Sequence, residues 1–306
     1  MTAKKALVTG GAGFIGSHIV EGLLGRGLEV VVVDNLSTGR KDQVAVDARL
    51  LEMDIRDAGI AKVFAQHRPD VVFHAAAQAS VVVSSEDPLV DAESNIMGSL
   101  NLLQACREHG IERFIYCSTG GALYGDPERL PCDEQHPIHP TSPYGVSKAT
   151  VELYLHSFSI LCGLNYTVLR YGNVYGPRQD PFGEAGVIAI FSQRMLRGEG
   201  VTIFGDGLQE RDFVYVSDVV EANLQAIGQD ENGVYNIGTG RGANVNGLFE
   251  RLTRLTDSPL EPHYEPARKG EVYKVYLDVA RARAGLEWEA KVGLDEGLAL
   301  TVDSFR

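Results

Sequence analysis

A glycine-rich turn near the N-terminus constrains the fold of this chain most strongly. Residues 10–16 read Gly-Gly-Ala-Gly-Phe-Ile-Gly and follow directly on a short apolar strand at residues 6–9. Glycine at positions 10, 13 and 16 allows a tight turn, a close approach of backbone to a pyrophosphate, and close packing of helix on strand. A helix that begins here presents free N–H groups and its positive dipole end to a phosphate. The strand, turn and helix together predict a dinucleotide site.

An acidic residue ends the next strand. Residues 29–34 read Glu-Val-Val-Val-Val-Asp, a β-branched run typical of a parallel strand that is buried on both faces. Asp34 lies 18 residues beyond Gly16, close to the spacing of the acid that hydrogen-bonds an adenosine ribose. Its charge would repel a 2′-phosphate and so favours NAD over NADP, although Arg40 and Lys41 follow it. The alternative is an ordinary surface Asp at a strand end.

Strands and helices alternate from residue 5 to residue 171. Further strands are expected at residues 50–55, 71–74, 114–119 and 166–171, with helices at residues 58–67, 88–109 and 144–162. This alternation predicts an α/β fold, a Rossmann-type doubly wound parallel sheet. Ligands bind at the carboxyl ends of such strands, where Asp34, Asp54, His74, Ser118 and Tyr171 fall. Asp54 is a candidate for contact with adenine or for a helix cap, and His74 is interpreted as a structural histidine.

The alternation breaks down beyond residue 172. Residues 1–172 are therefore expected to form the NAD-binding domain, with residues 212–240 packing back on it, and residues 173–211 and 241–306 are expected to form a smaller C-terminal lobe for the substrate. The pattern predicts a helix at residues 187–197, a strand at residues 202–204, and two short helices after residue 240.

A tyrosine and a lysine stand four residues apart at the start of one predicted helix. Ser142 suits the cap and Pro143 the first position, and Tyr144 and Lys148 then share a helical face. A positive charge near a phenol stabilises the phenolate, so Lys148 is expected to lower the pKa of Tyr144 and make it a proton-transfer group. By itself the pair is also compatible with chance spacing on an amphipathic helix.

Composition excludes several classes of partner. The formal net charge of −13 argues against nucleic acid and anionic membranes, which need a basic surface. Four cysteines without Cys-x-x-Cys spacing, and an N-terminus without a signal-peptide pattern, favour a reducing cytoplasmic setting. The eight histidines show no metal-ligand spacing, so no metal site is predicted.

Further motifs occur in a fixed order with those above. They are residues 74–80 (His-Ala-Ala-Ala-Gln-Ala-Ser), Asn95, Ser118-Thr119, Tyr124-Gly125, residues 170–173 (Arg-Tyr-Gly-Asn), residues 205–207 (Gly-Asp-Gly) and residues 211–213 (Arg-Asp-Phe). In this order the chain resembles the extended short-chain dehydrogenase/reductase family over nearly its whole length. The resemblance implies NAD-dependent epimerisation at carbon 4 of a UDP-hexose, UDP-glucose or UDP-galactose, through a 4-keto intermediate. Tyr144 would be the acid and base, and Lys148 would hold the nicotinamide ribose.

A hydroxyl from the end of the strand at residues 114–119 should complete the catalytic group. Gly120 stands where the family usually has a Ser or Thr, so Thr119 is the first candidate and Ser118 the next. The 4,6-dehydratases of this family carry an Asp-Glu pair after that hydroxyl, whereas this chain has Gly121-Ala122. A dehydratase is therefore not expected.

The resemblance also implies two sets of binding residues. The cofactor set is Gly10, Gly13, Phe14, Ile15, Gly16, Asp34, Asn35, Ser37, Gly39, Asp54, Ile55, Ala75, Ala76, Ala77, Asn95, Ser118, Tyr144, Lys148 and Tyr171. The substrate set is Ser80, Thr119, Tyr144, Asn173, Arg211, Arg268 and Val275. Within it, Asn173, Arg211 and Arg268 are expected to bind the UDP diphosphate, with Arg211 beside Asp212 open to interpretation as a plain surface ion pair. Val275 is expected near the sugar, where a small side chain favours acceptance of N-acetylated sugars.

Three other functions stay open from sequence alone. They are a nucleotide-sugar decarboxylase, for which Arg178 could contact the substrate carboxylate, a UDP-N-acetylhexosamine 4-epimerase, and a non-catalytic NAD(P)-binding regulator. The resemblance further implies a homodimer that packs through the helices at residues 88–109 and 144–162.

Overall fold

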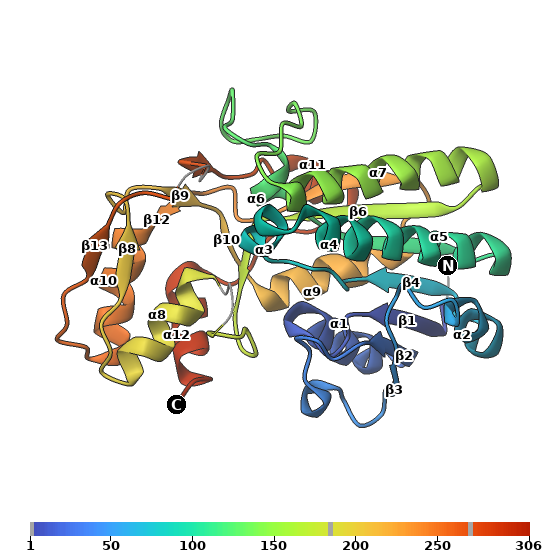
Figure 1. The fold of residues 1–306 in the computed structure, drawn as a ribbon, viewed down its shortest axis with the longest axis horizontal. Coiled ribbons are helices and arrows are strands. Elements are labelled where there is room, and N and C mark those ends of the chain that lie inside the picture. Colours follow the sequence, from blue (N-terminus) through green and yellow to red (C-terminus); the bar gives the residue numbers. More distant parts are fainter. Residues whose placement is uncertain (1–2, 183–185, 269–271) are drawn as a thin grey trace.

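A seven-stranded parallel sheet forms the centre of the computed structural model, which describes residues 3–182, 186–268 and 272–306 (Figure 1). In sheet order the strands are β11 (Gly233–Ile237), β6 (Asn165–Tyr171), β5 (Arg113–Thr119), β4 (Val71–His74), β1 (Lys5–Thr9), β2 (Glu29–Asp34) and β3 (Arg49–Glu52). The strand order reverses direction between β1 and β4, as it does in doubly wound sheets. The predicted Rossmann-type fold is confirmed.

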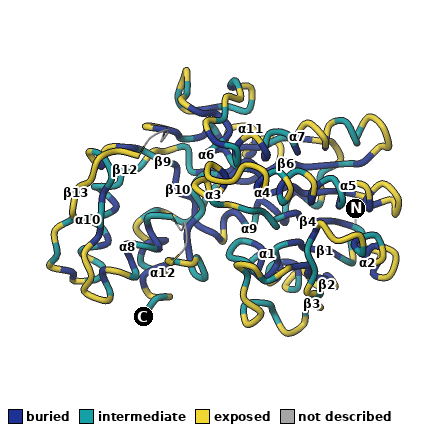
Figure 2. Tube along the Cα trace, viewed as in Figure 1, coloured by how far each residue is buried: buried dark blue, intermediate teal, exposed yellow. Residues whose placement is uncertain are grey.

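Alternate residues of the strands build two hydrophobic cores, one on each face of the sheet. On one face Val8, Val32 and Phe73 pack against helices α1 (Phe14–Gly25) and α9 (Val216–Gln225). On the other face Leu7 and Val33 pack against α2 (Ile60–His67), α5 (Gly98–His109) and α7 (Pro143–Cys162). Figure 2 shows β1, β2, β4, β5 and β6 buried over most of their length and the outer sides of these helices exposed, whereas the edge strand β3 has no buried residue. This burial on both faces explains why the strands read as continuous apolar runs.

The predicted helix at residues 88–109 is confirmed as three consecutive helical pieces. They are α4 (Pro88–Ala92), a π-helical turn η2 (Glu93–Met97) and α5. The Asp87 carboxylate caps α4 by accepting bonds from the N–H groups of Leu89 and Val90. A preceding helix, α3 (Val81–Glu86), is not predicted by the sequence pattern, because its three successive valines favour a strand. Ser80 caps α3 by accepting a bond from Val83 N–H at 2.9 Å.

Two expectations about the secondary structure are wrong. The strand expected at residues 50–55 ends at Glu52, because the Asp54 carboxylate accepts a bond from Arg56 N–H and turns the chain. After residue 240 the described residues contain three helices instead of two: α10 (Val245–Thr256), α11 (Ala280–Gly285) and α12 (Leu294–Asp303). The helix expected at residues 187–197 is confirmed as α8 (Val187–Leu196), and the strand at residues 202–204 is confirmed as β8 (Thr202–Phe204).

Helices α8, α10 and α12 lie away from the large sheet, on the left of Figure 1, and share a third core. Ile188, Leu248 and Leu298 from these helices meet Phe213 there. The remaining short elements are α6 (Gly120–Leu123), β7 (Asn173–Tyr175), β9 (Glu210–Arg211), β10 (Phe213–Tyr215), β12 (Ala243–Asn244), β13 (His263–Glu265), β14 (Lys274–Val275), η1 (Lys41–Gln43) and η3 (Ala226–Gly228). Small ladders join β10 to β7, β13 to β8, and β9 to both β12 and β14. Within the described residues, no helix combines the length and the apolar character needed to cross a bilayer.

Candidate active site

The glycine-rich turn packs so tightly that two of its glycines cannot be replaced without a clash. Gly10 has φ of +70°, and a Cβ there would lie 2.6 Å from the backbone nitrogen of Ala76. A Cβ at Gly16 would overlap the carbonyl oxygen of Gly10. In the part of the chain that the structure describes, no side chain caps α1 and its first turn carries no acidic residue. The N–H groups of Phe14 and Ile15 at this helix start therefore suit an anionic pyrophosphate.

Asp34 lies at the carboxyl end of β2 and holds the neighbouring turns in place. Its Oδ2 accepts a bond from Ala12 N–H at 3.0 Å, and its Oδ1 accepts one from Leu36 N–H at 2.8 Å. Gly39 packs on the same carboxylate, since a Cβ there would lie 2.9 Å from Asp34 Oδ1. Each carboxylate oxygen keeps a second acceptor position, as a ribose diol would need.

The polar residues next to Asp34 bind one another. Asn35 Nδ2 donates to Asp54 Oδ2 at 2.8 Å, and Ser37 N–H donates to Asn35 Oδ1 at 3.0 Å. The Arg56 guanidinium donates to both oxygens of Asp54 and holds the pKa of that carboxyl well below its usual range. Ile55, next in the chain, buries its side chain against Gly98. Contact of Asp54 with adenine stays a prediction, and its observed partners are Arg56 and Asn35.

His74 is a satisfied structural histidine, as predicted. Its Nδ1 and Nε2 lie 2.8 Å from the hydroxyl oxygens of Thr9 and Ser99, and burial lowers its pKa to about 3. The stretch that follows, Ala75 to Ala77, runs beside the glycine-rich turn.

Asn95 fixes the loop beyond these alanines. Its Nδ2 donates to the Gln78 carbonyl and to Asp91 Oδ1, both at 2.9 Å, and its Oδ1 accepts a bond from Gln78 N–H. The side chain of Asn95 is thus committed to protein partners, and a direct role at the cofactor stays a prediction.

Tyr144 and Lys148 lie together on α7, as predicted. Ser142 caps this helix by accepting a bond from Gly145 N–H, and Pro143 takes its first position. Lys148 is buried; its Nζ donates to the Cys117 carbonyl at 2.8 Å and lies 5.8 Å from the centre of the Tyr144 ring. The helix start is thereby bound to the carboxyl end of β5.

The expected lowering of the Tyr144 pKa by Lys148 is wrong for this structure. Burial raises the pKa of Tyr144, and the negative charges of Asp91 and of ionised Cys117 would raise it further. Burial also lowers the pKa of Lys148 to about 8, so its ammonium is itself strained by desolvation. Burial thus disfavours both the phenolate of Tyr144 and the ammonium of Lys148. A bound group of opposite charge would reduce this desolvation penalty.

The pKa of Lys148 gives a measurable pH dependence of stability. Above pH 8 the folded protein has lost the Lys148 proton, whereas the unfolded chain keeps it up to its ordinary pKa of 10.5. Stability must then rise with pH in this window, because the unfolded state binds more protons. We expect the unfolding free energy of wild type, relative to that of Lys148→Met, to increase by about 2 kcal/mol from pH 8 to about pH 9.5, because methionine does not titrate. Urea unfolding of NAD-free protein measures it, and a difference that is independent of pH would contradict the assignment.

The two candidate hydroxyls at the end of β5 have different environments. Ser118 is buried and donates to Glu152 Oε1 at 2.6 Å. Thr119 is partly exposed and caps α6 by accepting a bond from Ala122 N–H at 3.2 Å, which leaves its own proton free for another acceptor. Gly121 separates it from Asn173: a Cβ at Gly121 would lie 3.8 Å from Thr119 Oγ1 and 3.3 Å from Asn173 Oδ1. Thr119 thus faces the same space as a predicted substrate residue.

Gly120 points into the protein and not into the site. It is buried, and a Cβ there would lie 2.7 Å from both terminal methyl groups of Leu277. The Leu277 side chain fills the space beside Gly120, which explains why this position carries no side chain here.

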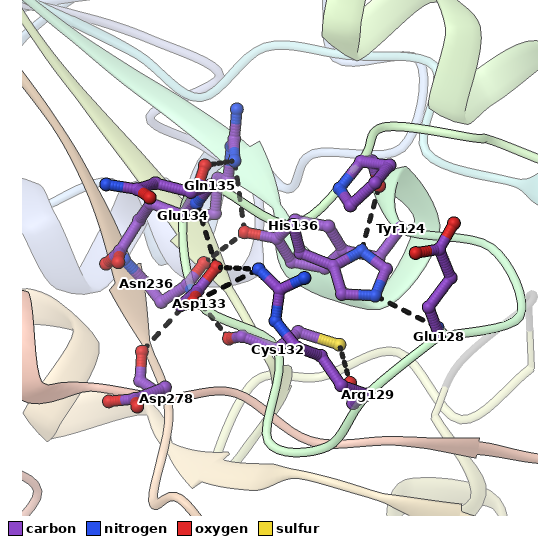
Figure 3. Close-up of polar contacts among 12 residues, drawn as sticks. Tyr124, Glu128, Arg129, Cys132, Asp133, Glu134, Gln135, His136, Asn236 and Asp278 are labelled. Atoms are coloured by element: carbon purple, nitrogen blue, oxygen red, sulfur yellow. Dashed lines mark hydrogen bonds and ion pairs between the residues drawn. The ribbon is translucent and has the colours of Figure 1, made fainter.

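A buried polar network behind the site is not predicted from sequence. The Arg170 guanidinium bonds to both oxygens of Glu152, with the shortest contact at 2.5 Å, and donates to the Tyr124 hydroxyl at 3.0 Å. Tyr124 in turn donates to Asn236 Oδ1 at 2.7 Å. Figure 3 shows Asn236 of β11 bonded to Tyr124 and to two residues of the loop between α6 and α7, Cys132 and Glu134. Glu152 lies one helical turn beyond Lys148, and this i+4 spacing is the only sequence signal for its position.

Three predicted substrate residues lie around the Arg211-Asp212 segment. Asn173 N–H donates to the Asp212 carbonyl, Arg211 precedes Asp212 in the chain, and Val275 pairs with Arg211 in the β14–β9 ladder. Asp212 is buried, so the interpretation of Arg211 and Asp212 as a surface ion pair is wrong.

Other predicted residues lie further from this group. Arg268 is exposed, and its guanidinium lies 4.0 Å from the centre of the Phe204 ring. Ser80 caps α3. Tyr171 is buried, and its hydroxyl lies 3.2 Å from Cys117 Sγ and accepts a bond from Asn223, on the α9 side of the sheet. Arg178 binds Glu21 and Ser17 on α1, so it lies beside the glycine-rich turn.

The Tyr144–Lys148 pair and the glycine-rich turn lie at the carboxyl edge of one parallel sheet, which defines a dinucleotide-dependent enzyme that moves a hydride together with a proton. The chain belongs to the NAD dependent epimerase/dehydratase family, whose model matches residues 6–238. A Methanocaldococcus jannaschii protein described as a putative UDP-glucose 4-epimerase is 46% identical over 297 residues, 97% of each chain.

Two solved structures share the fold over nearly the whole chain. The Thermotoga maritima UDP-glucose 4-epimerase, solved with UDP-glucose, is 54% identical with a TM-score of 0.97, over 98% of each chain. The Thermus thermophilus UDP-glucose 4-epimerase, in complex with NAD, is 48% identical with a TM-score of 0.93, also over 98% of each chain.

Proposed function

We propose that this protein is a NAD-dependent UDP-glucose 4-epimerase that interconverts UDP-glucose and UDP-galactose. The observation that carries the proposal is the placement of Tyr144 and Lys148 at the start of α7, bound to the end of β5 through the Cys117 carbonyl. Thr119 caps α6 on the same side as Asn173. The similarity to UDP-glucose 4-epimerases over nearly the whole chain supports the same activity.

The protein's own residues would handle the proton. NAD, when bound, would supply the hydride acceptor and donor for carbon 4 of the sugar. Tyr144, as its phenolate, would accept the proton of the sugar 4-hydroxyl to become the phenol and later give that proton back, with the positive charge of Lys148 close to the ring offsetting the burial that disfavours the phenolate. Thr119 would hydrogen-bond the same sugar oxygen and orient it toward Tyr144. Gly10, Gly16 and Asp34 would hold the pyrophosphate and ribose of the cofactor.

The surroundings of Arg178 weigh against the decarboxylase alternative. Arg178 is engaged with Glu21 at 2.5 Å and with Ser17 at 3.2 Å, so its guanidinium is committed to α1, next to the glycine-rich turn. Acceptance of N-acetylated sugars stays a hypothesis that rests on the small, buried Val275. Equal rates for UDP-N-acetylglucosamine with and without enzyme would remove it. The intact Tyr144 and Lys148 weigh against a non-catalytic regulator.

The most direct test is to incubate the purified protein with UDP-galactose, without added cofactor, and to assay UDP-glucose. Formation of UDP-glucose supports epimerisation on NAD that stays bound. A protein that remains inactive after NAD is added would overturn the proposal.

We expect Thr119→Val to lower kcat by about 10- to 100-fold and to leave NAD content unchanged, because one oriented donor to the reacting oxygen is lost. Ser118→Ala is the matched control: its hydroxyl is bound to Glu152, so kcat should fall by less than about threefold. Initial rates of UDP-galactose epimerisation measure both. A larger loss for Ser118→Ala than for Thr119→Val would reverse the assignment of the two hydroxyls.

We further propose a division into a NAD-binding domain, residues 1–172 with residues 212–240, and a sugar-nucleotide lobe, residues 173–211 and 241–306. The separate core of α8, α10 and α12 supports it. Within the segment 212–240, Val219 and Ala222 of α9 pack in the core of the NAD-binding domain, whereas Phe213 of β10 packs in the core of the lobe.

A homodimer is proposed through the helical segment 88–109, which comprises α4, η2 and α5, and through α7. Leu89 on α4 and Leu153, Ile160 and Leu161 on α7 each expose more than 70% of their surface, which is apolar area that a second copy would cover. A cytoplasmic setting is also proposed, where Cys106, Cys117 and Cys132, which are buried and unpaired, stay reduced.

A further inference from the structure

We propose that Asp212 is a positioning residue that holds the sugar-nucleotide residues Asn173 and Arg211 and the Thr119 turn in one fixed arrangement. The proposal rests on the proposed function for the identity of the ligand. Asp212 stands between β9 and β10, directly after Arg211. It is 2% exposed, so its charge is compensated by the protein alone.

The carboxylate of Asp212 accepts four hydrogen bonds from two distant segments. Oδ1 accepts from the N–H and the hydroxyl of Thr239, both at 2.7 Å. Oδ2 accepts from Gly240 N–H at 3.1 Å and from Leu277 N–H at 3.2 Å. The turn after β11 and the segment after β14 are therefore fixed to the same side chain.

The backbone around Asp212 is equally constrained. Its carbonyl accepts a bond from Asn173 N–H at 2.6 Å, which sets the start of β7. A Cβ at Gly172 would lie 2.6 Å from the Asp212 carbonyl oxygen, and a Cβ at Gly238 would lie 2.5 Å from Asp212 Oδ2. Only glycine permits this approach on either side, so Asp212 has little freedom to move without moving Asn173.

Leu277 extends this arrangement to the catalytic hydroxyl. Its N–H is bound to Asp212 Oδ2, and its side chain packs on Gly120, the residue after Thr119. One buried carboxylate thus fixes the positions of Asn173, Arg211 and Thr119, although these residues come from three separate parts of the chain. NAD-binding residues such as Gly10 and Asp34 have no bond to Asp212.

Asparagine at position 212 would test the role with almost no change in volume. An amide offers one acceptor oxygen and one donor nitrogen, so the nitrogen would face two of the four donors and push one segment away. We expect Asp212→Asn to weaken UDP binding and raise KM for UDP-galactose by about tenfold or more, because small misplacements of binding groups are costly. NAD content and NAD affinity should stay within about twofold of wild type. A role confined to stability would not separate UDP affinity from NAD affinity in this way.

Asp218 offers a matched control six residues further on. It is 4% exposed, and its Oδ2 accepts bonds from Lys291 N–H and Val292 N–H, which lie in a segment without predicted site residues. Asp218→Asn should therefore lower Tm without changing the UDP dissociation constant. Calorimetric titration with UDP and circular dichroism on all three proteins make the comparison.

A milder variant keeps the test decisive if Asp212→Asn fails to fold. Thr239→Val removes the bond from Oγ1 to Asp212 and the longer contact of Oγ1 with the Arg241 carbonyl but keeps the bond from Thr239 N–H, and we expect it to weaken UDP binding by about two- to fivefold. Folded variants that bind UDP as tightly as wild type and Asp218→Asn would overturn the inference and leave the proposed function intact. A wild-type protein that binds no UDP would overturn the proposed function and the inference with it.

Discussion

Replacing Tyr144 with Phe is expected to lower kcat for UDP-galactose epimerisation by about 10²–10⁴-fold, the range found when a general acid and base is removed. The substitution takes away only the hydroxyl, so the α7 cap, the Lys148 bond to the Cys117 carbonyl and the glycine-rich turn stay unchanged. NAD content and the KM for the sugar nucleotide should therefore change little. Initial rates with UDP-galactose, together with the absorbance of released NAD, measure the two effects separately.

Tyr116→Phe is the matched control for Tyr144→Phe. The same Lys148 ammonium lies 4.9 Å from the centre of the Tyr116 ring and 5.8 Å from that of Tyr144, but Tyr116 is fully buried in the core beneath. Its hydroxyl cannot reach a substrate, so the loss of activity should stay under about tenfold. An equal loss in both variants would mean that Lys148 placement, and not proton transfer by Tyr144, sets the rate. Unchanged activity in Tyr144→Phe would overturn the mechanism.

The elements that local sequence determines were predicted well. The strand at residues 29–34 is a continuous β-branched run, and the structure begins and ends β2 at those residues. The Tyr144–Lys148 pair needed only helical spacing and the Ser142-Pro143 start, both of which depend on neighbours in the chain. The glycines of the phosphate turn were also recognisable, because a tight turn between strand and helix leaves a local pattern.

Properties that depend on distant residues could not be predicted in this way. The sequence left Thr119 and Ser118 as alternatives, and it is Glu152 on α7 that binds one of them. The glycine at position 120 looked like the loss of a catalytic hydroxyl, whereas Leu277 occupies its place. The direction of the Tyr144 pKa shift was wrong for the same reason: burial is a property of the assembled site, and it outweighs a charge placed by helix spacing.

Breaking the buried ion pair between Glu152 and Arg170 is expected to destabilise the protein more than any other single change discussed above. The two side chains are 8% and 5% exposed, and each carboxylate oxygen of Glu152 is bonded to the guanidinium. Glu152→Gln would leave the Arg170 charge buried without its counter-charge, at a cost of about 3–5 kcal/mol. Urea unfolding at pH 7 with NAD removed measures the loss.

The network around this pair makes the prediction specific. The cost should come from the unpaired charge of Arg170 and not from lost packing, so Arg170→Met added to Glu152→Gln should recover about half of the lost stability or more. Ser118→Ala removes only the neutral donor to Glu152 and should cost about 1 kcal/mol. Glu152 follows Lys148 by one turn of α7, so its loss should leave Tyr144 less firmly held. We therefore expect Glu152→Gln to have a lower kcat than wild type even at temperatures below its unfolding transition. A double variant that is less stable than Glu152→Gln would show that Arg170 stabilises the fold through Tyr124 and the loop between α6 and α7, independently of its partner on α7.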